Sequence, residues 1–332
     1  MTASRSARAR AHANIALAKY WGKADVPRNL TAVPSLSLTL SGMRTTTEVT
    51  FAQELAADEL TLGGAAQQGK ALQRVSRLLA EVRGLSGVSL FARVRSHNDF
   101  PTAAGLASSA SGFAALALAA AQAAGLSLSL EAVSALARAA SASAARSLYG
   151  GFVELAAGAE TAARVAPPEH WPLCMLVAVT SEAAKETGST EGMQHTAATS
   201  PYYAAWLGDA PRLFEEVKQA VLARDFERLA PAVEQSALMM HASMLAARPA
   251  LLYFRPATLA VIEQVRALRR AGTEACFTID AGPHVKVLVA LGVAARVEQA
   301  LAQVPGVLQV LASEIGPDAR ILAEGEATEA LA

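Results

Sequence analysis

The chain has 332 residues, of which 52% are hydrophobic and 17% are charged. This composition excludes a disordered chain and supplies enough apolar residues for the cores of two domains. The 29 basic and 29 acidic side chains give a net charge of zero, so neither nucleic acid nor an anionic membrane is expected as a partner.

The cysteines and the N-terminus favour a cytoplasmic protein. Cys174 and Cys276 lie far apart in apolar runs, so we expect buried free thiols, as in a reducing compartment. Residues 1–10 lack the apolar core of a signal peptide. The uncharged window 100–130 is interrupted by Gly, Ser and Pro, and it predicts a buried helix rather than a membrane span.

The N-terminal part has the alternation typical of strands. Residues 11–18 predict a strand that runs into Lys19-Tyr20-Trp21-Gly22-Lys23. Two lysines around an aromatic pair fit either a solvated turn with buried aromatics or two cationic donors for a phosphorylated substrate. Three more strands are expected after this loop, the first two forming a hairpin: 36–40, 45–51 and 59–62.

The most informative stretch is 101–112, Pro-Thr-Ala-Ala-Gly-Leu-Ala-Ser-Ser-Ala-Ser-Gly. It lies between a predicted strand, 88–95, and a predicted apolar helix, 109–124. Gly105 can take a positive φ, and Ser108 or Ser109 can cap the helix, whose N-terminus favours anionic oxygen. No Gly-Lys-Ser/Thr follows, so this is not a Walker loop. The pattern fits a phosphate-binding loop and a small-residue turn on a buried helix equally well.

Segments with helical spacing lie on both sides of this stretch. Each carries arginines that can be interpreted in two ways. A helix over 69–83 carries Arg74 and Arg77 on one face, where they are either solvated or within reach of a phosphate. Helices are also expected over 130–140 and around 143–148. Between these, Ser141 and Ser143 precede Arg146 and could bind one ligand with it, although spacing alone favours an Ala-rich helix start with a surface arginine.

The second half reads as an α+β unit. A strand over 173–180 precedes a hydroxyl-rich loop, and we place the domain boundary there, giving domains 1–182 and 183–332. Residues 191–247 are predicted to be helical throughout, with His241 packed among methionines rather than catalytic. The strand 276–280 ends in an aspartate at a Gly-Pro turn. The remaining expected elements are helices 258–270 and 293–303 and strands 285–289, 307–311 and 321–322.

Taken together, these segments resemble the diphosphomevalonate decarboxylases of the GHMP kinase superfamily. The resemblance runs through nearly the whole chain in the right order. The matching pieces are Asn14-Ile15-Ala16 with Lys19-Tyr20-Trp21-Gly22-Lys23, the run Phe100–Ser109, Arg146-Ser147-Leu148-Tyr149-Gly150-Gly151-Phe152, Phe277-Thr278-Ile279-Asp280-Ala281-Gly282-Pro283 and, more weakly, Gly188–Met193 and Met240-His241-Ala242.

The resemblance implies a fold and a reaction. The fold is an α+β GHMP kinase fold, with an N-terminal domain like the second domain of ribosomal protein S5, a ferredoxin-like C-terminal domain and often a homodimer. In the reaction, ATP with Mg²⁺ phosphorylates the tertiary C3 hydroxyl of mevalonate 5-diphosphate. Loss of that phosphate with CO₂ then leaves isopentenyl diphosphate.

The resemblance also implies roles for individual residues. Asp280 would orient the hydroxyl and accept its proton, Arg146 would hold the substrate carboxylate, and Lys19 would neutralise charge beside them. The remaining substrate contacts would come from Tyr20, Trp21, Gly22, Lys23, Ser141, Ser143, Ser189 and Thr190. The ATP contacts would come from Ser96, Asn98, Pro101, Ala103, Ala104, Gly105, Leu106, Ala107, Ser108 and Ser109, with Ser108 also meeting Mg²⁺.

The sequence departs from the family pattern at one place and leaves other functions open. Ala140 and Ala142 stand where many members have glycine, so this loop must use ordinary helical or extended backbone. Mevalonate 5-phosphate is an alternative substrate, and a kinase that stops at the 3-phosphate is an alternative activity. A nucleotide-binding regulator without catalysis is a third possibility, but no candidate catalytic position is missing.

Overall fold

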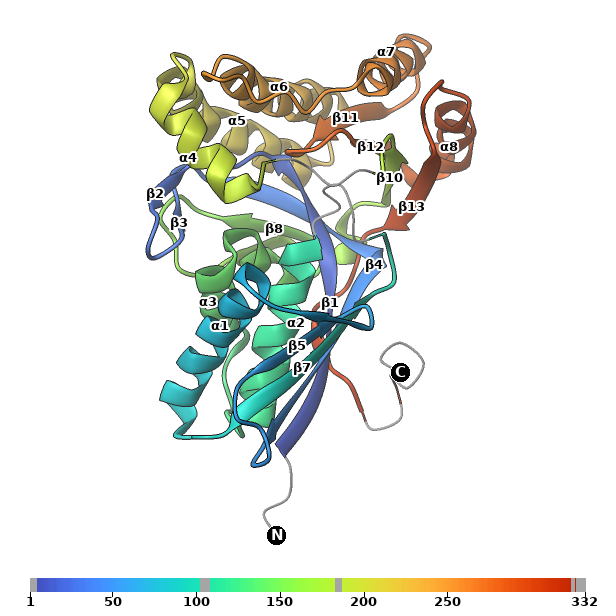
Figure 1. The fold of residues 1–332 in the computed structure, drawn as a ribbon. Helices are drawn as coiled ribbons and strands as arrows, with labels where there is room; N and C mark the ends of the chain where they lie inside the picture. Colours follow the sequence, from blue (N-terminus) through green and yellow to red (C-terminus); the bar gives the residue numbers. More distant parts are fainter. Residues whose placement is uncertain (1–4, 102–107, 183–186, 324–325, 327–332) are drawn as a thin grey trace.

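The computed structural model describes residues 5–101, 108–182, 187–323 and 326. In these ranges the chain forms two lobes, each a sheet with helices layered on it (Figure 1). None of the helices in this part of the chain combines the length and apolarity needed to cross a bilayer. The mixed α+β architecture agrees with the fold that the sequence predicts.

The first lobe is built on an eight-stranded sheet in the order β14-β1-β4-β7-β5-β6, with β8 pairing with β4 and β9 with β8. All of its pairings are antiparallel except that of β5 with β7. The strands are β1 (Arg5–Ala18), β4 (Ser35–Ala52), β5 (Glu59–Leu62), β6 (Ala65–Gln67), β7 (Phe91–Asn98), β8 (Phe152–Leu155), β9 (Ala163–Ala166) and β14 (Arg320–Ile321); a separate ribbon pairs β2 (Lys23–Asp25) with β3 (Leu30–Thr31).

The hairpin predicted over 36–51 is wrong, because both segments belong to the single strand β4. Gly42, between them, marks a close approach rather than a turn. Its amide donates to Ser313 Oγ at 2.9 Å, and a Cβ there would lie 3.4 Å from the Ala312 carbonyl oxygen. β1 follows β4 antiparallel along almost its whole length, with register shifts between His12 and Asn14 and between Ala16 and Ala18.

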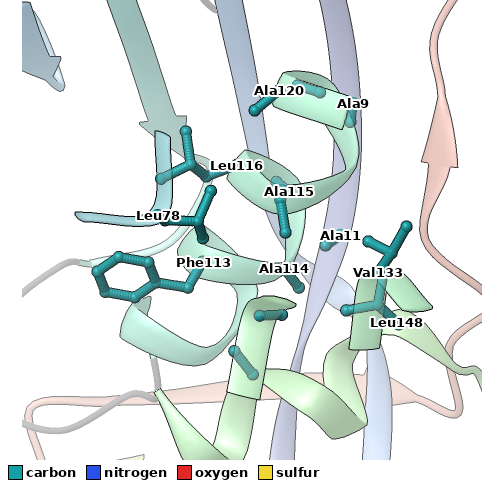
Figure 2. Packing of buried hydrophobic residues seen from close by; sticks show 14 of the residues in the cluster. Ala9, Ala11, Leu78, Phe113, Ala114, Ala115, Leu116, Ala120, Val133 and Leu148 are labelled. Carbon is teal, nitrogen blue, oxygen red and sulfur yellow. The ribbon is translucent and has the colours of Figure 1, made fainter. Parts of the chain in front are cut away.

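The helices of the first lobe cover its sheet, and α2 (Ser108–Ala123) packs there largely through alanines. The helices are α1 (Lys70–Ser86), α2, α3 (Leu130–Ala140) and the 3₁₀ helix η1 (Ala142–Leu148). α2 is buried almost all round, as predicted for the apolar window. Figure 2 shows alanines of α2 beside Ala9 and Ala11 of β1, with Leu78 and Leu148 closing the cluster. Alanine lets this helix lie close to the strand.

The second lobe is a four-stranded antiparallel sheet in the order β11-β12-β10-β13. Its strands are β10 (Leu173–Val179), β11 (Ala275–Ile279), β12 (Val285–Ala290) and β13 (Gln309–Glu314). Its helices are α4 (Ser189–Thr199), α5 (Tyr203–Ala223), α6 (Phe226–Leu245), α7 (Pro256–Arg270) and α8 (Ala294–Ala302), with short 3₁₀ turns η2 (Pro168–His170) and η3 (Leu291–Val293). Residues 191–247 are thus largely helical as predicted, but they form three helices.

The two faces of the second sheet have different partners. One face packs under α7 and α8, where Val261 and Val297 meet Val285 and Val287. The other joins a cluster that spans both lobes and includes Ile15 of β1 and Leu288 of β12. Cys174 and Cys276 are free and buried, as predicted.

The chain changes sheets at places that the domain prediction does not mark. β10 precedes the boundary at 182/183, which stays a prediction, but it already pairs in the second sheet. β14, near the end of the chain, returns to pair with β1. The chain therefore passes from the first sheet to the second before β10 and returns to the first sheet at β14.

Candidate active site

Two strands from opposite lobes end at the same point. β1 ends at Ala18 and is followed by Lys19, and β11 ends at Ile279 and is followed by Asp280. Lys19 Nζ lies 2.5 Å from Asp280 Oδ1. Thr278 Oγ1 donates to the Ala16 carbonyl at 3.2 Å and fastens the two strands together. The predicted acid of the second half therefore meets the predicted cation of the first.

A second lysine, which the sequence analysis missed, completes this cluster. Lys286 of β12 places its Nζ 3.1 Å from Asp280 Oδ2. The signal was a single charge in the otherwise apolar run Val285–Val289. A buried ammonium needs a counterion, so that lysine already called for an acid nearby.

The two lysines determine the charge state of Asp280. Burial favours the neutral acid, but the charges and hydrogen bonds of Lys19 and Lys286 outweigh it and hold the pKa of Asp280 well below its usual range. Burial lowers the pKa of Lys19 to about 8, with Asp280 opposing this shift and Lys286 and Arg146 adding to it. The carboxylate is thus ionised at neutral pH, and its side chain is 27% exposed while the lysines are 2% and 0% exposed.

The backbone of Asp280 is held by α6. His241 Nε2 lies 3.1 Å from the Asp280 carbonyl oxygen, and its ring packs on Phe254 with centroids 4.5 Å apart. Burial lowers the pKa of His241 to about 4, so the neutral ring donates this hydrogen bond. The prediction that His241 is packed is confirmed.

Arg146 lies buried in η1. The surface position that residue spacing alone favoured for it is therefore wrong. Its Nε donates to Ser37 Oγ at 2.9 Å and its Nη1 to Ser35 Oγ at 2.5 Å. Asn14 Oδ1 accepts from Nε at 3.4 Å and from Nη2 at 3.3 Å. These partners are neutral, and burial lowers the pKa of Arg146 to about 10. The guanidinium stays charged at neutral pH with no carboxylate bound to it in the described part of the chain.

Further cations lie near Arg146, around the side chain of Tyr20. Arg146 and Arg74 both stabilise the ionised form of Tyr20, although burial still raises the pKa of Tyr20 to about 12. Arg74 lies over the Phe113 ring, 4.5 Å from its centroid, and its Nη2 donates to the Ala140 carbonyl at 3.0 Å. Burial and Arg74 together lower the pKa of Lys23, whose Nζ donates to Asn29 Oδ1.

The result is an excess of positive charge at one place. Among the described residues, the salt bridges give these five cations a single carboxylate partner, Asp280: Lys19, Lys23, Arg74, Arg146 and Lys286. In a chain of zero net charge, such a cluster indicates a site for an anionic ligand.

The predicted hydroxyl donors lie at element ends. Ser141 is extended, with φ −157° and ψ 116°, and its Oγ is 3.4 Å from Ser143 Oγ. Ordinary backbone here is what the alanines at 140 and 142 require. Ser189 and Thr190 form the first turn of α4, where amide groups favour anions.

Trp21 and Gly22 do not join the cations. Trp21 is buried, and its Nε1 donates to Thr196 Oγ1 at 3.0 Å. Gly22 has φ +126°, and a Cβ there would lie 2.0 Å from Tyr203 Oη. Both residues anchor the loop after β1 against α4 and α5.

The predicted nucleotide contacts that the structure describes lie at the end of β7 and the start of α2. Ser96 Oγ is 2.8 Å from Thr47 Oγ1, and Asn98 Oδ1 accepts from Thr45 Oγ1 at 2.6 Å. Ser108 and Ser109 both lie in the first turn of α2 rather than before it, so neither is the cap residue. Pro101 is exposed. The other predicted loop residues, Ala103, Ala104, Gly105, Leu106 and Ala107, lie outside the described residues.

The described residues contain no group of three or more His, Cys, Asp or Glu side chains placed to hold a metal ion. A groove between β2 and α4, lined by Lys23, Met193 and Gln194, extends the cationic region. Another depression, lined by Leu238, Met239 and Arg269, includes none of the predicted site residues.

Comparison with known proteins gives matches over nearly the whole chain. The model of the diphosphomevalonate decarboxylase-like N-terminal domain matches residues 11–166, and that of the mevalonate 5-diphosphate decarboxylase C-terminal domain matches residues 175–315. Diphosphomevalonate decarboxylase of Candida albicans is 36% identical over 303 residues, 85% of this chain and 83% of that protein. The Homo sapiens enzyme is 32% identical over 300 residues, 82% and 74% of the two chains.

Solved structures give the same picture. Mevalonate diphosphate decarboxylase from Staphylococcus aureus superposes with a TM-score of 0.92 at 38% identity, over 97% of this chain and 99% of that one. A structure of MDDEF in complex with MVAPP, AMPPCP and magnesium gives a TM-score of 0.90 at 40% identity, over 96% and 99%. The predicted GHMP kinase fold is confirmed.

Proposed function

Because this chain belongs to the diphosphomevalonate decarboxylase family and is an enzyme of that family, we propose that it uses ATP to decarboxylate mevalonate 5-diphosphate. The products would be isopentenyl diphosphate, ADP, phosphate and CO₂. The observation that carries this proposal is the meeting of Asp280 with Lys19 between the lobes, beside a buried Arg146 that has no acidic partner among the described residues.

Phosphoryl transfer to the C3 hydroxyl needs orientation and charge stabilisation more than strong basicity. Because the transition state is loose, the hydroxyl proton becomes acidic late, and a weak base suffices if it is well placed. Asp280, ionised and partly exposed, would orient the hydroxyl and take its proton. Lys19 would meet the charge that spreads over the transferring phosphoryl oxygens.

ATP and Mg²⁺ fit the first turn of α2. The helix N-terminus presents amide groups to anionic oxygen, and the Ser108 hydroxyl is of the type that binds a hard cation. Ser108 would help to hold the Mg²⁺, which when bound would supply positive charge to the phosphate groups. Ser96 and Asn98 lie on β7, the strand that leads toward this helix, where they would meet the nucleoside.

Decarboxylation would use Arg146. When phosphate leaves C3, positive charge develops on a tertiary carbon, and the neighbouring carboxylate collapses to CO₂ and the alkene. Guanidinium has five N–H donors, and the contacts to Ser35, Ser37 and Asn14 engage three of them. The remaining donors would hold the carboxylate in line for elimination.

The distal diphosphate would be held by donors at the rim of the site. These are Tyr20, Lys23, Ser141, Ser143, Ser189 and Thr190, with Arg74 as an additional cation. Binding at this end anchors C3 from a distance and supplies the proximity that the reaction needs. Trp21 and Gly22 would act by holding the loop after β1 rather than by touching substrate.

Turnover with two substrates tests the proposal. Purified enzyme with ATP and Mg²⁺ should release ADP, phosphate and CO₂ in equal amounts from mevalonate 5-diphosphate, and much more slowly from mevalonate 5-phosphate. Faster turnover of mevalonate 5-phosphate would mean that the monophosphate is the substrate. Release of ADP without CO₂ would mean that the enzyme is a kinase that stops at the 3-phosphate. We also propose that the protein is cytoplasmic and forms a homodimer. Size-exclusion chromatography with light scattering can test the oligomeric state.

A further inference from the structure

Lys286 is a fully buried lysine in the middle of a sheet. Side chains alternate between the faces of a strand, and Val285 and Val287 of β12 point under α7 and α8. Lys286 therefore points to the opposite face with Leu288, toward the first lobe. Its side chain is 0% exposed. Burying an ammonium group is costly unless it is paired and hydrogen-bonded, so its partners indicate why it is there.

Each oxygen of Asp280 has its own lysine. Lys286 Nζ lies 3.1 Å from Oδ2 and 3.4 Å from the carbonyl oxygen of His284, while Lys19 Nζ lies 2.5 Å from Oδ1. Two points of attachment determine the plane of the carboxylate, whereas one would let it rotate. The Lys286 side chain is 0% exposed and that of Asp280 is 27% exposed, so Lys286 lies behind the carboxylate that a ligand can reach.

We propose that Lys286 is a positioning residue for Asp280. Beneath the site and out of reach of substrate, it holds Oδ2 and prevents the carboxylate from turning wholly onto Lys19. This keeps the carboxylate and the Lys19 ammonium in the arrangement that proton transfer from the C3 hydroxyl requires. The inference rests on the proposed function, because it assigns Lys286 to the same reaction.

The charge of Lys286 has an effect that packing alone would not produce. Lys19 is faced by Asp280, Lys286, Arg146 and the neutral His241, and its pKa is about 8. Lys286 disfavours protonation of Lys19, so removing its charge should raise the pKa of Lys19. If protonated Lys19 is needed, the alkaline limb of kcat/KM should then move to higher pH.

Asp280 is surrounded in the same way. The groups facing it are Lys19, Lys286, the backbone-bonded His241, and, at longer range, His284 and Arg146. Burial lowers the pKa of His284 to about 4, so neither histidine carries charge near neutral pH. The histidines therefore do not contribute to a shift of the alkaline limb.

Full-length Lys286→Met, Lys286→Gln and Leu288→Met variants test the inference. Leu288→Met is the control, because it alters the same face of the same strand without touching Asp280. The rate of CO₂ release is measured from pH 6 to 10 with mevalonate 5-diphosphate, ATP and Mg²⁺. For Lys286→Met we expect kcat to fall about tenfold or more, KM to change by less than about threefold, and the alkaline limb to move up by about one pH unit.

Lys286→Gln separates the hydrogen bond from the charge. It keeps a donor for Oδ2, so it should recover part of kcat while keeping the shifted limb. The inference would be overturned if Lys286→Met and Lys286→Gln both kept the wild-type kcat and the wild-type alkaline limb of kcat/KM. Equal effects of Lys286→Met and Leu288→Met would also overturn it. Absence of CO₂ from the wild-type enzyme would instead reject the proposed function.

A double-mutant cycle gives a second test of the inference for the case that the single variants fold poorly. In an Asp280→Asn background, Lys286 has lost the carboxylate through which it acts. Adding Lys286→Met should then lower residual kcat by less than about twofold. A further tenfold loss would show that Lys286 acts on its own and would overturn the inference.

Discussion

At the scale of single residues, the chemistry depends on charges that the fold keeps out of water. Asp280 stays ionised because lysines from two different strands hold its two oxygens. Arg146 stays unneutralised because its partners among the described residues are two serines and an asparagine. An ionised Asp280 can accept a proton from a reactive hydroxyl, and an unneutralised Arg146 can bind an anionic group. An anionic substrate with a reactive hydroxyl needs both features.

Replacing Asp280 with asparagine tests the first feature. Asp280→Asn should lower ADP release by about 10²-fold or more, because the hydroxyl loses its proton acceptor, while ATP binding measured by calorimetry stays within about threefold. The variant leaves two buried lysines unpaired, so thermal unfolding should also show a loss of stability. Asp209→Asn, on an exposed ion pair with Arg212, is the control. Normal turnover in Asp280→Asn would remove this carboxylate from the reaction.

Arg146→Lys tests the second feature. Lysine keeps the charge but loses the planar fork, so the substrate carboxylate should be misplaced and CO₂ release should fall about 100-fold. Trapping of labelled CO₂ measures the rate. Arg83→Lys changes another fork, paired with Asp58 away from the site, and should leave the rate unchanged. An unaffected rate in Arg146→Lys would mean that another group holds the carboxylate.

At the scale of elements, the site lies where secondary structure stops. Lys19 directly follows β1, Asp280 directly follows β11, and Arg146 lies in the last turn of η1. The loop after β1 carries Lys19, Tyr20 and Lys23 and is held by its contact with α5. The position of these three side chains therefore depends on how closely that loop can approach the helix.

Gly22→Ala tests this dependence. The residue has φ +126°, and an added Cβ would meet Tyr203 Oη at 2.0 Å, so the loop must shift. We expect a loss of about 1–3 kcal/mol in the free energy of unfolding and a rise of about tenfold in KM for mevalonate 5-diphosphate. Adding Tyr203→Phe should restore part of both. Gly208→Ala, where a Cβ meets nothing within 4 Å, is the matched control. Wild-type KM in Gly22→Ala would show that the loop position does not matter.

At the scale of the whole molecule, one buried cluster spans both lobes and binds them into a single unit. It includes residues of β1, β4, α5, α6 and the second sheet. Two neutral histidines, His241 and His284, are buried beside the site on the second lobe. Burial lowers the pKa of each to about 4. Both therefore resist protonation in the native state.

Acid stability follows from these two groups. Between pH 6.5 and 4 the unfolded chain binds more protons at each histidine than the native chain, so stability falls as pH falls through this window. From pH 7 to 5 the loss is about 2 kcal/mol per histidine. His284→Asn, which keeps an acceptor for the Thr180 amide, should reduce the loss by that amount in urea unfolding at the two pH values. An unchanged loss in His284→Asn would contradict the assignment.

Local patterns in the sequence were enough for most elements. Period-two alternation predicted β5 and β12, and helical spacing predicted α1 and α3, because these signals depend on neighbours within a few residues. The same local rules predicted a hairpin in place of β4 and missed the return of β14 to β1. Both errors concern partners that are remote in the chain, as when Gly42 meets β13.

The sequence by itself determined the family, the order of the motifs and three charged residues of the site, Lys19, Arg146 and Asp280. Only the tertiary structure decided how those charges are balanced: that Asp280 has a second lysine, that Arg146 is buried, and that Trp21 packs instead of facing the site. The reason is physical. A residue type and its spacing specify what chemistry is available, but the energy of a charge depends on burial and on neighbours up to 261 positions away, which only the folded chain brings together.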